Sequence, residues 1–284
     1  MATIGVIGGS GLYEIEGLKQ LERVAVSTPF GDPSDTIVRG RIGEVTLLFL
    51  PRHGKGHRLA PHRINYRANI YGLKQLGAQQ IISVSAVGSL KESIHPGEIS
   101  LVDQYIDRTR SRPSSFFEDH GLVAHVAFGD PVDQALLQAL YDAAVQVGAK
   151  VHKGGTYICI EGPQFSTRAE SNLYRSWGAD VVGMTNLPEA RLAREAELPY
   201  ASIAMVTDYD CWHEVEEDVT AANVIEVLNR NVETSRKIIG AVLTRLPDPA
   251  QSPAFNALQN AFLTAPECIT EEKRDLLKLL LGRN

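Results

Sequence analysis

Two acidic side chains offer the most specific chemistry in this chain. Asp208 and Asp210 follow the apolar run Ala201-Ser-Ile-Ala-Met205, which predicts a buried strand. Side chains two residues apart on a strand point the same way, so both carboxylates would face one ligand. Such a pair can hold a proton and accept from an amino group, as on an adenine ring. Asp also favours helix caps and turns, and alone the pair favours that plainer interpretation.

Three short turns after apolar runs carry groups that can bind an anion: Gly8-Gly-Ser-Gly11, Pro51-Arg-His-Gly54 and Ser85-Ala-Val-Gly-Ser89. Glycine lets backbone N–H groups approach an anion, and the hydroxyl of Ser10 adds a donor. Arg52 presents a planar fork of donors suited to phosphate, and His53 could donate or shuttle a proton. Because each turn follows a strand, we expect all three to converge around one phosphate-sized anion at a sheet edge. Singly, each is also compatible with an ordinary turn, since the first has neither P-loop nor dinucleotide spacing.

Two further turns carry groups suited to a flat ring and to the anion. In Glu161-Gly-Pro-Gln-Phe-Ser166, Phe165 could stack on a ring or pack in the core, and Ser166 could hydrogen-bond the ring edge. Thr185 could complete the anion cage, while Met184 supplies an adaptable apolar wall or is an ordinary core residue.

Composition excludes several classes of protein. A formal net charge of −6 without a basic cluster argues against nucleic-acid binding. No apolar run approaches the roughly 20 residues of a membrane helix, and the N-terminus does not resemble a signal peptide. Cys159, Cys211 and Cys268 are sparse and odd in number, which favours a reducing, cytoplasmic compartment. The histidines between His53 and His62 have no Cys or acidic ligand beside them, so we predict no metal.

Strand-like and helix-like stretches alternate without a linker, which predicts one α/β domain over residues 1–246. Helices are expected over 62–76, from an N-cap at Asp133 to Gly148, and from about Thr220 past Ile239. Prolines then break the chain, and residues 247–284 are expected to form a helical appendix on the same domain or on a neighbouring subunit. Its helices are predicted around Ala257–Leu263 and over Glu271–Leu281.

Further short motifs join these sites along the chain: Thr28-Pro-Phe-Gly-Asp-Pro-Ser34, Asn65-Tyr66, Ala68-Asn69, Asp103-Gln104, Ile106-Asp-Arg-Thr109, Pro188-Glu189 and Thr207-Asp-Tyr-Asp-Cys-Trp212. With them, the chain from Ile4 to about Leu243 resembles the trimeric nucleoside phosphorylases, and within them the 5′-methylthioadenosine phosphorylase family. The resemblance implies a central mixed, twisted β-sheet flanked by helices, a homotrimer, and no metal or cofactor.

The resemblance also implies roles for single residues. The implied phosphate site consists of Ser10, Arg52, His53, Ser85, Ala86 and Thr185. Met184 would meet the ribose, Phe165 would flank the base, and Asp208 and Asp210 would bind adenine at N7 and the 6-amino group. Tyr209 between them is also expected to bind the substrate. Ser166 and Ala221 occupy positions that tune specificity, because members that use 6-oxopurines tend to carry Glu in place of Ser166 and Asn in place of Asp208. A neighbouring subunit would contribute His125 to a 5′ pocket lined by Val224 and Ile225.

The implied reaction is the reversible phosphorolysis of 5′-methylthioadenosine to adenine and 5-methylthioribose 1-phosphate, as part of purine and methionine salvage. Asp208 is the candidate acid at the departing base, with Asp210 beside it. Three alternatives remain at this stage. A phosphorylase of 6-oxopurine nucleosides or methylthioinosine is disfavoured by Asp208 and Ser166, a hydrolase would not need an anion cage, and a non-catalytic nucleoside-binding protein would not need the acid.

Overall fold

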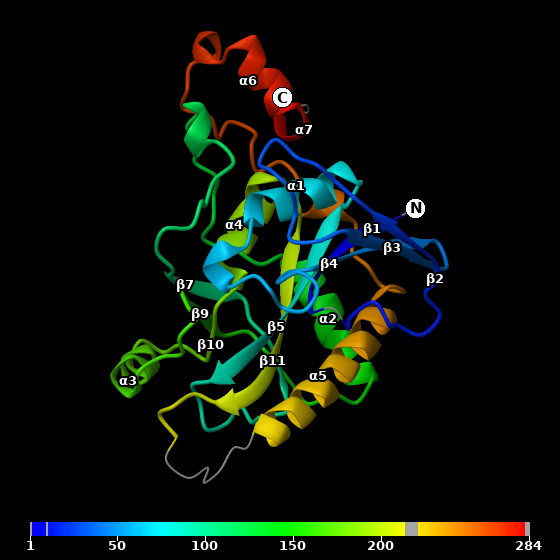
Figure 1. The fold of residues 1–284 in the computed structure, drawn as a ribbon, viewed down its shortest axis with the longest axis vertical. Coiled ribbons are helices and arrows are strands. Elements are labelled where there is room, and N and C mark those ends of the chain that lie inside the picture. Colours follow the sequence, from blue (N-terminus) through cyan, green and yellow to red (C-terminus); the bar gives the residue numbers. More distant parts are fainter. Residues whose placement is uncertain (1, 10, 214–220, 282–284) are drawn as a thin grey trace.

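The computed structural model describes residues 2–9, 11–213 and 221–281, and for 221–225 and 281 the backbone alone. Its centre is a sheet that contains 11 strands within the described residues (Figure 1). The strands are β1 Thr3–Gly8, β2 Lys19–Val24, β3 Ile37–Ile42, β4 Val45–Pro51, β5 Gln80–Ser89, β6 Ile99–Leu101, β7 Gln104–Arg108, β8 Val151–Lys153, β9 Thr156–Ile160, β10 Val181–Gly183 and β11 Tyr200–Tyr209.

The long strand β5 is where the sheet changes direction. Along its first part β5 pairs in parallel with β1, and on its other side it pairs in parallel with β11 as far as Ser89; β1 in turn pairs in parallel with β4. At its end β5 instead pairs antiparallel with β10, which runs parallel to β9. The sheet is therefore mixed, as expected. The turns after β1, β4 and β5 leave one edge together, whereas those after β9 and β10 approach the end of β5 from the opposite direction.

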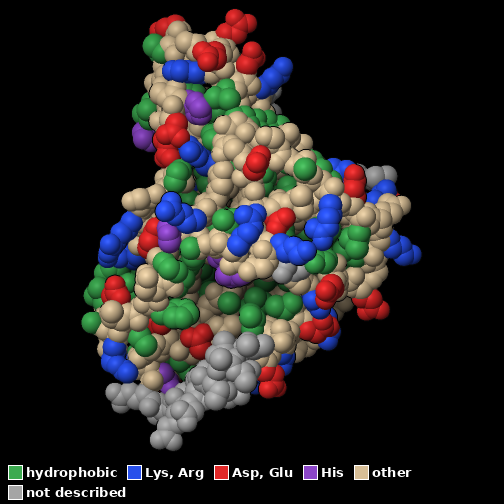
Figure 2. Space-filling model, in the orientation of Figure 1, with side chains coloured by type: hydrophobic (Ala, Val, Ile, Leu, Met, Phe, Trp, Pro, Cys, Tyr) green, Lys and Arg blue, Asp and Glu red, His purple; other side chains and the backbone are tan. Residues whose placement is uncertain are grey.

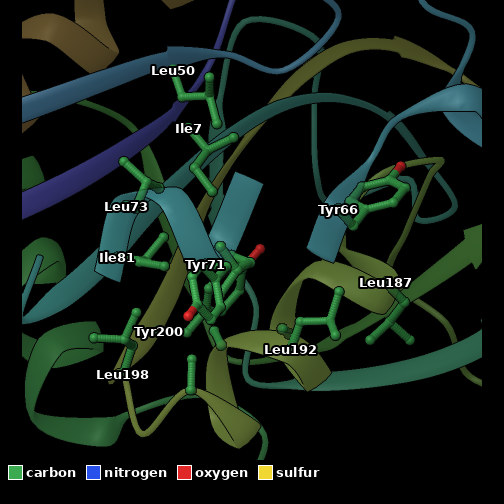
Figure 3. Packing of buried hydrophobic residues seen from close by; sticks show 14 of the residues in the cluster. Ile7, Leu50, Tyr66, Tyr71, Leu73, Ile81, Leu187, Leu192, Leu198 and Tyr200 are labelled. Atoms are coloured by element: carbon green, nitrogen blue, oxygen red, sulfur yellow. The ribbon is translucent and has the colours of Figure 1, made fainter. Parts of the chain in front are cut away.

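Helices cover both faces of the sheet (Figure 1). They are α1 Tyr66–Gln75, α2 Gln134–Gln146, α3 Arg168–Ser176, α4 Asn186–Glu195, α5 Ala221–Val242, α6 Glu271–Leu276 and α7 Lys278–Leu281, with 3-10 turns at Pro61–Arg63, Glu118–His120, Pro249–Gln251 and Pro266–Cys268. Strand side chains alternate between two buried clusters, so that Ile7 packs towards α1 and α4 while Val6 packs towards α2 and α5. Figure 3 shows part of the first cluster, in which Leu73 of α1 lies near Ile81 of β5 and Leu187 and Leu192 of α4 lie on the other side of the view.

The predicted helices are largely confirmed. Helix α2 begins where expected, because the Asp133 side chain accepts a hydrogen bond from the Leu136 N–H, and it stops before Gly148, whose φ is 75°. Helix α5 matches the predicted long helix, and the 62–76 stretch contains a 3-10 turn followed by α1. The sequence pattern does not predict five elements, namely strands β2, β7 and β8 and helices α3 and α4. The shortest of them leave little periodic signal.

The prediction of a helix around Ala257–Leu263 is wrong. The chain there forms consecutive tight turns, and its backbone bonds to the segment around Val123 and His125 instead. The His125 N–H donates to the Ala261 carbonyl, and the Leu263 N–H donates to the Val123 carbonyl. Those groups are therefore unavailable to a helical ladder. The expected helix over Glu271–Leu281 is interrupted at Leu277, which separates α6 from α7.

Residues after Pro247 pack on the same chain that carries the sheet. Leu258, Leu277 and Leu280 are fully or almost fully buried, and they belong to the same apolar cluster as Ile7 and Tyr200. The appendix thereby covers one face of the domain and holds the segment around His125. Within the described residues no helix is long and apolar enough to cross a membrane.

Candidate active site

A cavity of about 720 Å³ opens at the edge of the sheet where the predicted turns meet. Figure 2 shows a hollow near the centre of the face in view, where hydrophobic and histidine side chains are exposed. The predicted site residues that line the cavity are Arg52, His53, Ser85, Ala86, Phe165, Ser166, Met184, Thr185, Asp208 and Asp210. The structure thus brings together residues that are up to 158 positions apart in the sequence, between Arg52 and Asp210.

The anion-binding half of the cavity is formed by the turns after β1 and β4 and by Ser85 and Ala86 of β5. The prediction of a turn over Ser85–Ser89 is wrong, because these residues continue β5 and pair with β11. Gly8, Gly9 and Gly11 line the cavity, while Ser10 lies outside the described residues. A Cβ at Gly8 would lie 2.3 Å from Leu12 Cδ1 and 3.1 Å from the Val84 carbonyl oxygen, so a larger residue would displace Leu12 and crowd β5. The Ser85 hydroxyl donates to Asn186 Oδ1 at 3.3 Å, which holds its oxygen at the cavity wall.

Thr185 contributes from the start of α4. It occupies the N-cap position and is 5% exposed, yet its side chain makes no capping hydrogen bond. Because the hydroxyl is not used to cap the helix, it can serve a ligand in the cavity that Thr185 lines.

The guanidinium of Arg52 does not face the cavity as a free fork, which corrects the expectation for this side chain. It is 2% exposed and forms a two-pronged ion pair with Glu189 of α4, with Nε–Oε2 and Nη2–Oε1 distances of 2.8 and 3.0 Å. Its other contacts are the carbonyls of Ile7 and Val84 and the hydroxyl of Ser83. Glu189 raises the pKa of Arg52, so the guanidinium is permanently charged. Its charge is neutralised by a carboxylate of the protein and not by a ligand.

His53 lies half-buried at the cavity wall as a neutral imidazole. Its Nδ1 lies 2.8 Å from the Leu59 carbonyl oxygen, so Nδ1 carries the proton and Nε2 is an acceptor. Burial lowers the pKa of His53 to about 4, which agrees with the neutral form of the ring. The ring stacks on His57 at 4.0 Å between centroids.

The two acids face the same cavity, as the sequence predicts. A register shift in β11 between Val206 and Asp208 places Asp208 opposite Gly88, and a Cβ at Gly88 would lie 3.4 Å from Asp208 Oδ2 and 3.5 Å from Asp210 Cβ. Asp208 Oδ1 accepts a hydrogen bond of 2.6 Å from the Thr207 hydroxyl. Asp210 Oδ2 is buried and has no hydrogen-bond partner among the described residues. A buried carboxylate oxygen of this kind requires a donor, which a ligand can supply.

The loop after β9 completes the ring-binding side. Phe165 is 84% exposed and lines the cavity, so the alternative of core packing is wrong for this residue. The Ser166 hydroxyl is buried without a partner among the described residues, and it also lines the cavity. Gly162 has a φ of 66°, and a Cβ there would lie 2.5 Å from Met184 Sδ, so glycine lets the loop rest on Met184.

Some predicted residues lie elsewhere or outside the description. Tyr209 is not part of the cavity lining, because its hydroxyl lies 2.6 Å from His95 Nδ1 and its ring stacks on His213. His125 is exposed and away from the cavity of its own chain. The side chains of Ala221, Val224 and Ile225 fall outside the described residues.

Helix α5 supplies cavity residues that sequence reasoning did not assign to a site. Leu228 and Val232 stand on its inward stripe, so helical periodicity could have indicated them. Asn229 and Arg236 gave no such signal. The Arg236 Nε donates to the Gly11 carbonyl at 2.8 Å, which ties α5 to the first anion-binding turn. Within the part of the chain that the structure describes, no group of three His, Cys, Asp or Glu could hold a metal.

The site combines a mixed sheet with anion donors and a carboxylate pair around one cavity. Comparison with known proteins identifies the class of protein that has this arrangement. Residues 3–244 match the phosphorylase superfamily, and the chain belongs to this family. It is 54% identical to S-methyl-5′-thioadenosine phosphorylase of Geobacter sulfurreducens, over 99% of this chain and 98% of the relative, and 52% identical to the protein of that name from Thermosynechococcus vestitus, over 99% of both chains.

Solved structures agree with this assignment. A methylthioadenosine phosphorylase from an antarctic soil metagenomic library is 46% identical, with a TM-score of 0.93 over 99% of both chains. The methylthioadenosine phosphorylase of Schistosoma mansoni in complex with adenine is 37% identical, with a TM-score of 0.85 over 93% of this chain and all of that one. The expected nucleoside phosphorylase fold is therefore confirmed.

Proposed function

We infer that this protein catalyses the reversible phosphorolysis of 5′-methylthioadenosine, giving adenine and 5-methylthioribose 1-phosphate. The observation that carries the proposal is one cavity with anion donors on one side and, on the other, the Asp210 Oδ2 atom and the Ser166 hydroxyl, which have no hydrogen-bond partner among the described residues. Similarity over the full chain to phosphorylases of this name supports the substrate. One pentose would lie between the two sides.

The proposed reaction starts with the departure of the base. As the N-glycosidic bond lengthens, the sugar gains oxocarbenium character and negative charge develops on the purine. Asp208 would donate a proton to N7, and Asp210 Oδ2 would accept a hydrogen bond from the 6-amino group. The short bond from Thr207 fixes the orientation of the Asp208 carboxyl. General-acid help of this kind contributes about two to four powers of ten to the rate.

Phosphate then attacks the anomeric carbon from the opposite face of the sugar. Backbone N–H groups around Gly9 and Ala86, with the hydroxyls of Ser85 and Thr185, would hold the anion in line. His53 Nε2 accepts a hydrogen bond in its neutral form, so it would orient a protonated phosphate oxygen. No metal or cofactor takes part in this proposal, and inorganic phosphate is the co-substrate.

The preference for a 6-amino ring would depend on Ser166 and Asp210. The buried Ser166 hydroxyl can adapt to the ring edge, and the Asp210 carboxylate accepts from an amino group but would repel a 6-oxo group. Leu228 and Val232 give the cavity apolar surface next to α5, which suits a methylthio group better than a free hydroxyl.

We also propose that the active form is a homotrimer in the cytoplasm. An exposed His125 that lies away from its own cavity is free to enter a neighbour's 5′ pocket, which Val224 and Ile225 would line. The three cysteines are free thiols, which fits a reducing compartment.

The decisive experiment follows adenine release from 5′-methylthioadenosine with and without added phosphate. We expect release that depends on phosphate and produces a sugar 1-phosphate, and inosine at equal concentration should react far more slowly. Release at the same rate without phosphate would indicate a hydrolase. Binding of the nucleoside without any release would indicate a non-catalytic binding protein.

A further inference from the structure

Arg52 of the Arg52–Glu189 pair contacts the backbone of two strands next to the anion-binding residues. Its Nη2 donates to the Ile7 carbonyl at 3.2 Å, near the end of β1, and its Nη1 donates to the Val84 carbonyl at 2.9 Å, directly before Ser85 within β5. Its own backbone N–H donates to the Gly8 carbonyl at 2.9 Å. Arg52, which directly follows β4, therefore joins β1, β4 and β5 beside the anion-binding residues.

Glu189 holds this guanidinium from the other side. It is 1% exposed and accepts four hydrogen bonds, two from Arg52, one from the Ser83 hydroxyl at 2.7 Å and one from the Tyr200 hydroxyl at 2.9 Å. A buried pair with this many partners is costly to break from one side only. Glu189 lies behind the cavity wall and is absent from its lining.

A second arginine holds the nucleoside half in the same manner. Arg112 is 7% exposed and pairs with Glu161, with an Nε–Oε2 distance of 3.0 Å. It donates to the carbonyls that flank the ring-binding loop and the Met184 turn, namely Ile160 (3.3 Å), Glu161 (2.6 Å), Met184 (2.7 Å) and Leu187 (2.8 Å). The ends of β9 and β10 are thus joined by one side chain that lies outside the cavity lining.

We propose that the two Arg–Glu pairs are separate positioning devices, one for each substrate. Arg52 with Glu189 sets the backbone of β1, β4 and β5, which supplies most of the phosphate donors, and Arg112 with Glu161 sets the loop after β9 and the Met184 backbone, which bind the nucleoside. Thr185, which is expected to bind phosphate, lies beside the carbonyls held by Arg112. The inference rests on the proposed function for the identity of the substrates. Each pair acts through buried backbone carbonyls, which need a donor and hold their strands in place when they receive one.

The variant Glu189→Gln separates positioning from direct contact. If Arg52 bound phosphate itself, loss of the opposing carboxylate would free its charge for the anion, and phosphate would bind more tightly. In a positioning pair, the same change loosens Arg52 from Ile7 and Val84, and phosphate binds more weakly. The two roles therefore predict opposite signs for one measurement.

The experiment measures dissociation constants for phosphate and for adenine by calorimetry, together with both KM values, in Arg52→Lys, Glu189→Gln, Arg112→Lys and Glu161→Gln. Loss of one buried charge-assisted hydrogen bond corresponds to about tenfold in affinity. We expect about tenfold weaker phosphate binding in the first two variants and about tenfold weaker adenine binding in the last two. The other ligand should change by less than about threefold in each case.

Control variants and a double variant keep the test decisive. Arg39→Lys and Glu22→Gln break an exposed pair of 3.5 Å on β3 and β2, and both constants should stay unchanged. If single variants fail to fold, Arg52→Met combined with Glu189→Leu removes both charges and should fold with weakened phosphate binding. Any one of three results would overturn the proposal. These are tighter phosphate binding in Glu189→Gln, normal phosphate binding in the double variant, and equal weakening of the binding of both ligands in all four variants. Because binding is measured without turnover, failure of the proposed reaction would appear separately, as inactivity of the unmodified chain.

Discussion

Phe165 offers a direct test of how the cavity binds a ring. The side chain is 84% exposed, so Phe165→Ala removes little buried surface and should change the free energy of unfolding by less than about 0.5 kcal/mol. An aromatic contact with a base contributes about 0.5–1.5 kcal/mol beyond its area, which corresponds to a rise of about 2- to 13-fold in KM for the nucleoside. The KM for phosphate should stay constant, because Phe165 follows β9 and the anion-binding turns follow other strands.

The assay is steady-state adenine release with each substrate varied in turn, alongside thermal unfolding. Phe165→Leu keeps apolar bulk without a flat ring, so its KM should lie between those of the wild type and Phe165→Ala. Phe116→Ala provides the contrast, since Phe116 is fully buried and its truncation should cost about 3–5 kcal/mol of stability. An unchanged nucleoside KM in Phe165→Ala would refute the stacking role, and a large loss of stability would refute the exposed placement.

Three further outcomes are expected. Asp208→Asn should lower kcat by about two to four powers of ten and leave the affinity for phosphate unchanged. Turnover is followed by a calorimetric or spectroscopic assay, and a normal kcat in this variant would remove Asp208 from the mechanism. Leu277→Ala should cost about 2–5 kcal/mol of stability in denaturant unfolding, because Leu277 is fully buried in the apolar cluster that also contains residues of the sheet. Almost no loss of stability would mean that the appendix does not contact the core. Burial lowers the pKa of His53 from 6.5 to about 4. Between these two pH values the unfolded chain binds a proton at His53 that the folded chain does not bind. The free energy of unfolding should therefore fall as the pH drops from about 6.5 to 4. After discounting for solvent screening at this half-buried ring the loss is about 1–2 kcal/mol, and His53→Gln should lack it when unfolding is compared at pH 7 and pH 4.5.

The parts of the site that depend on local sequence could be predicted. Gly8, Ser85 and Asp208 come at the ends of apolar runs in a regular order, and the rule that parallel strands end at one edge was enough to place them together, although Ser85 and Asp208 lie within their strands and not after them. The N-cap at Asp133 was equally local, because a capping side chain acts within three residues.

What could not be predicted depends on pairing between distant residues. The fork of Arg52 suits a carboxylate as well as a phosphate, and its partner Glu189 lies 137 residues further along the chain. Similarly, the periodicity near Leu258 is that of a helix, yet the backbone beyond it bonds to the segment at Val123. In both cases the local pattern allowed two outcomes, and a tertiary contact decided between them.

The change of direction at β5 has a consequence for how such sites diverge. Most groups for the anion come from β1, β4 and β5, whereas Phe165, Ser166 and Met184 come after β9 and β10, which run the other way. Asp208 and Asp210 come from the end of β11 and Thr185 follows β10, so each half of the site also receives a group from the other set of strands. The loop after β9 can therefore change length and composition without displacing the turns after β1 and β4.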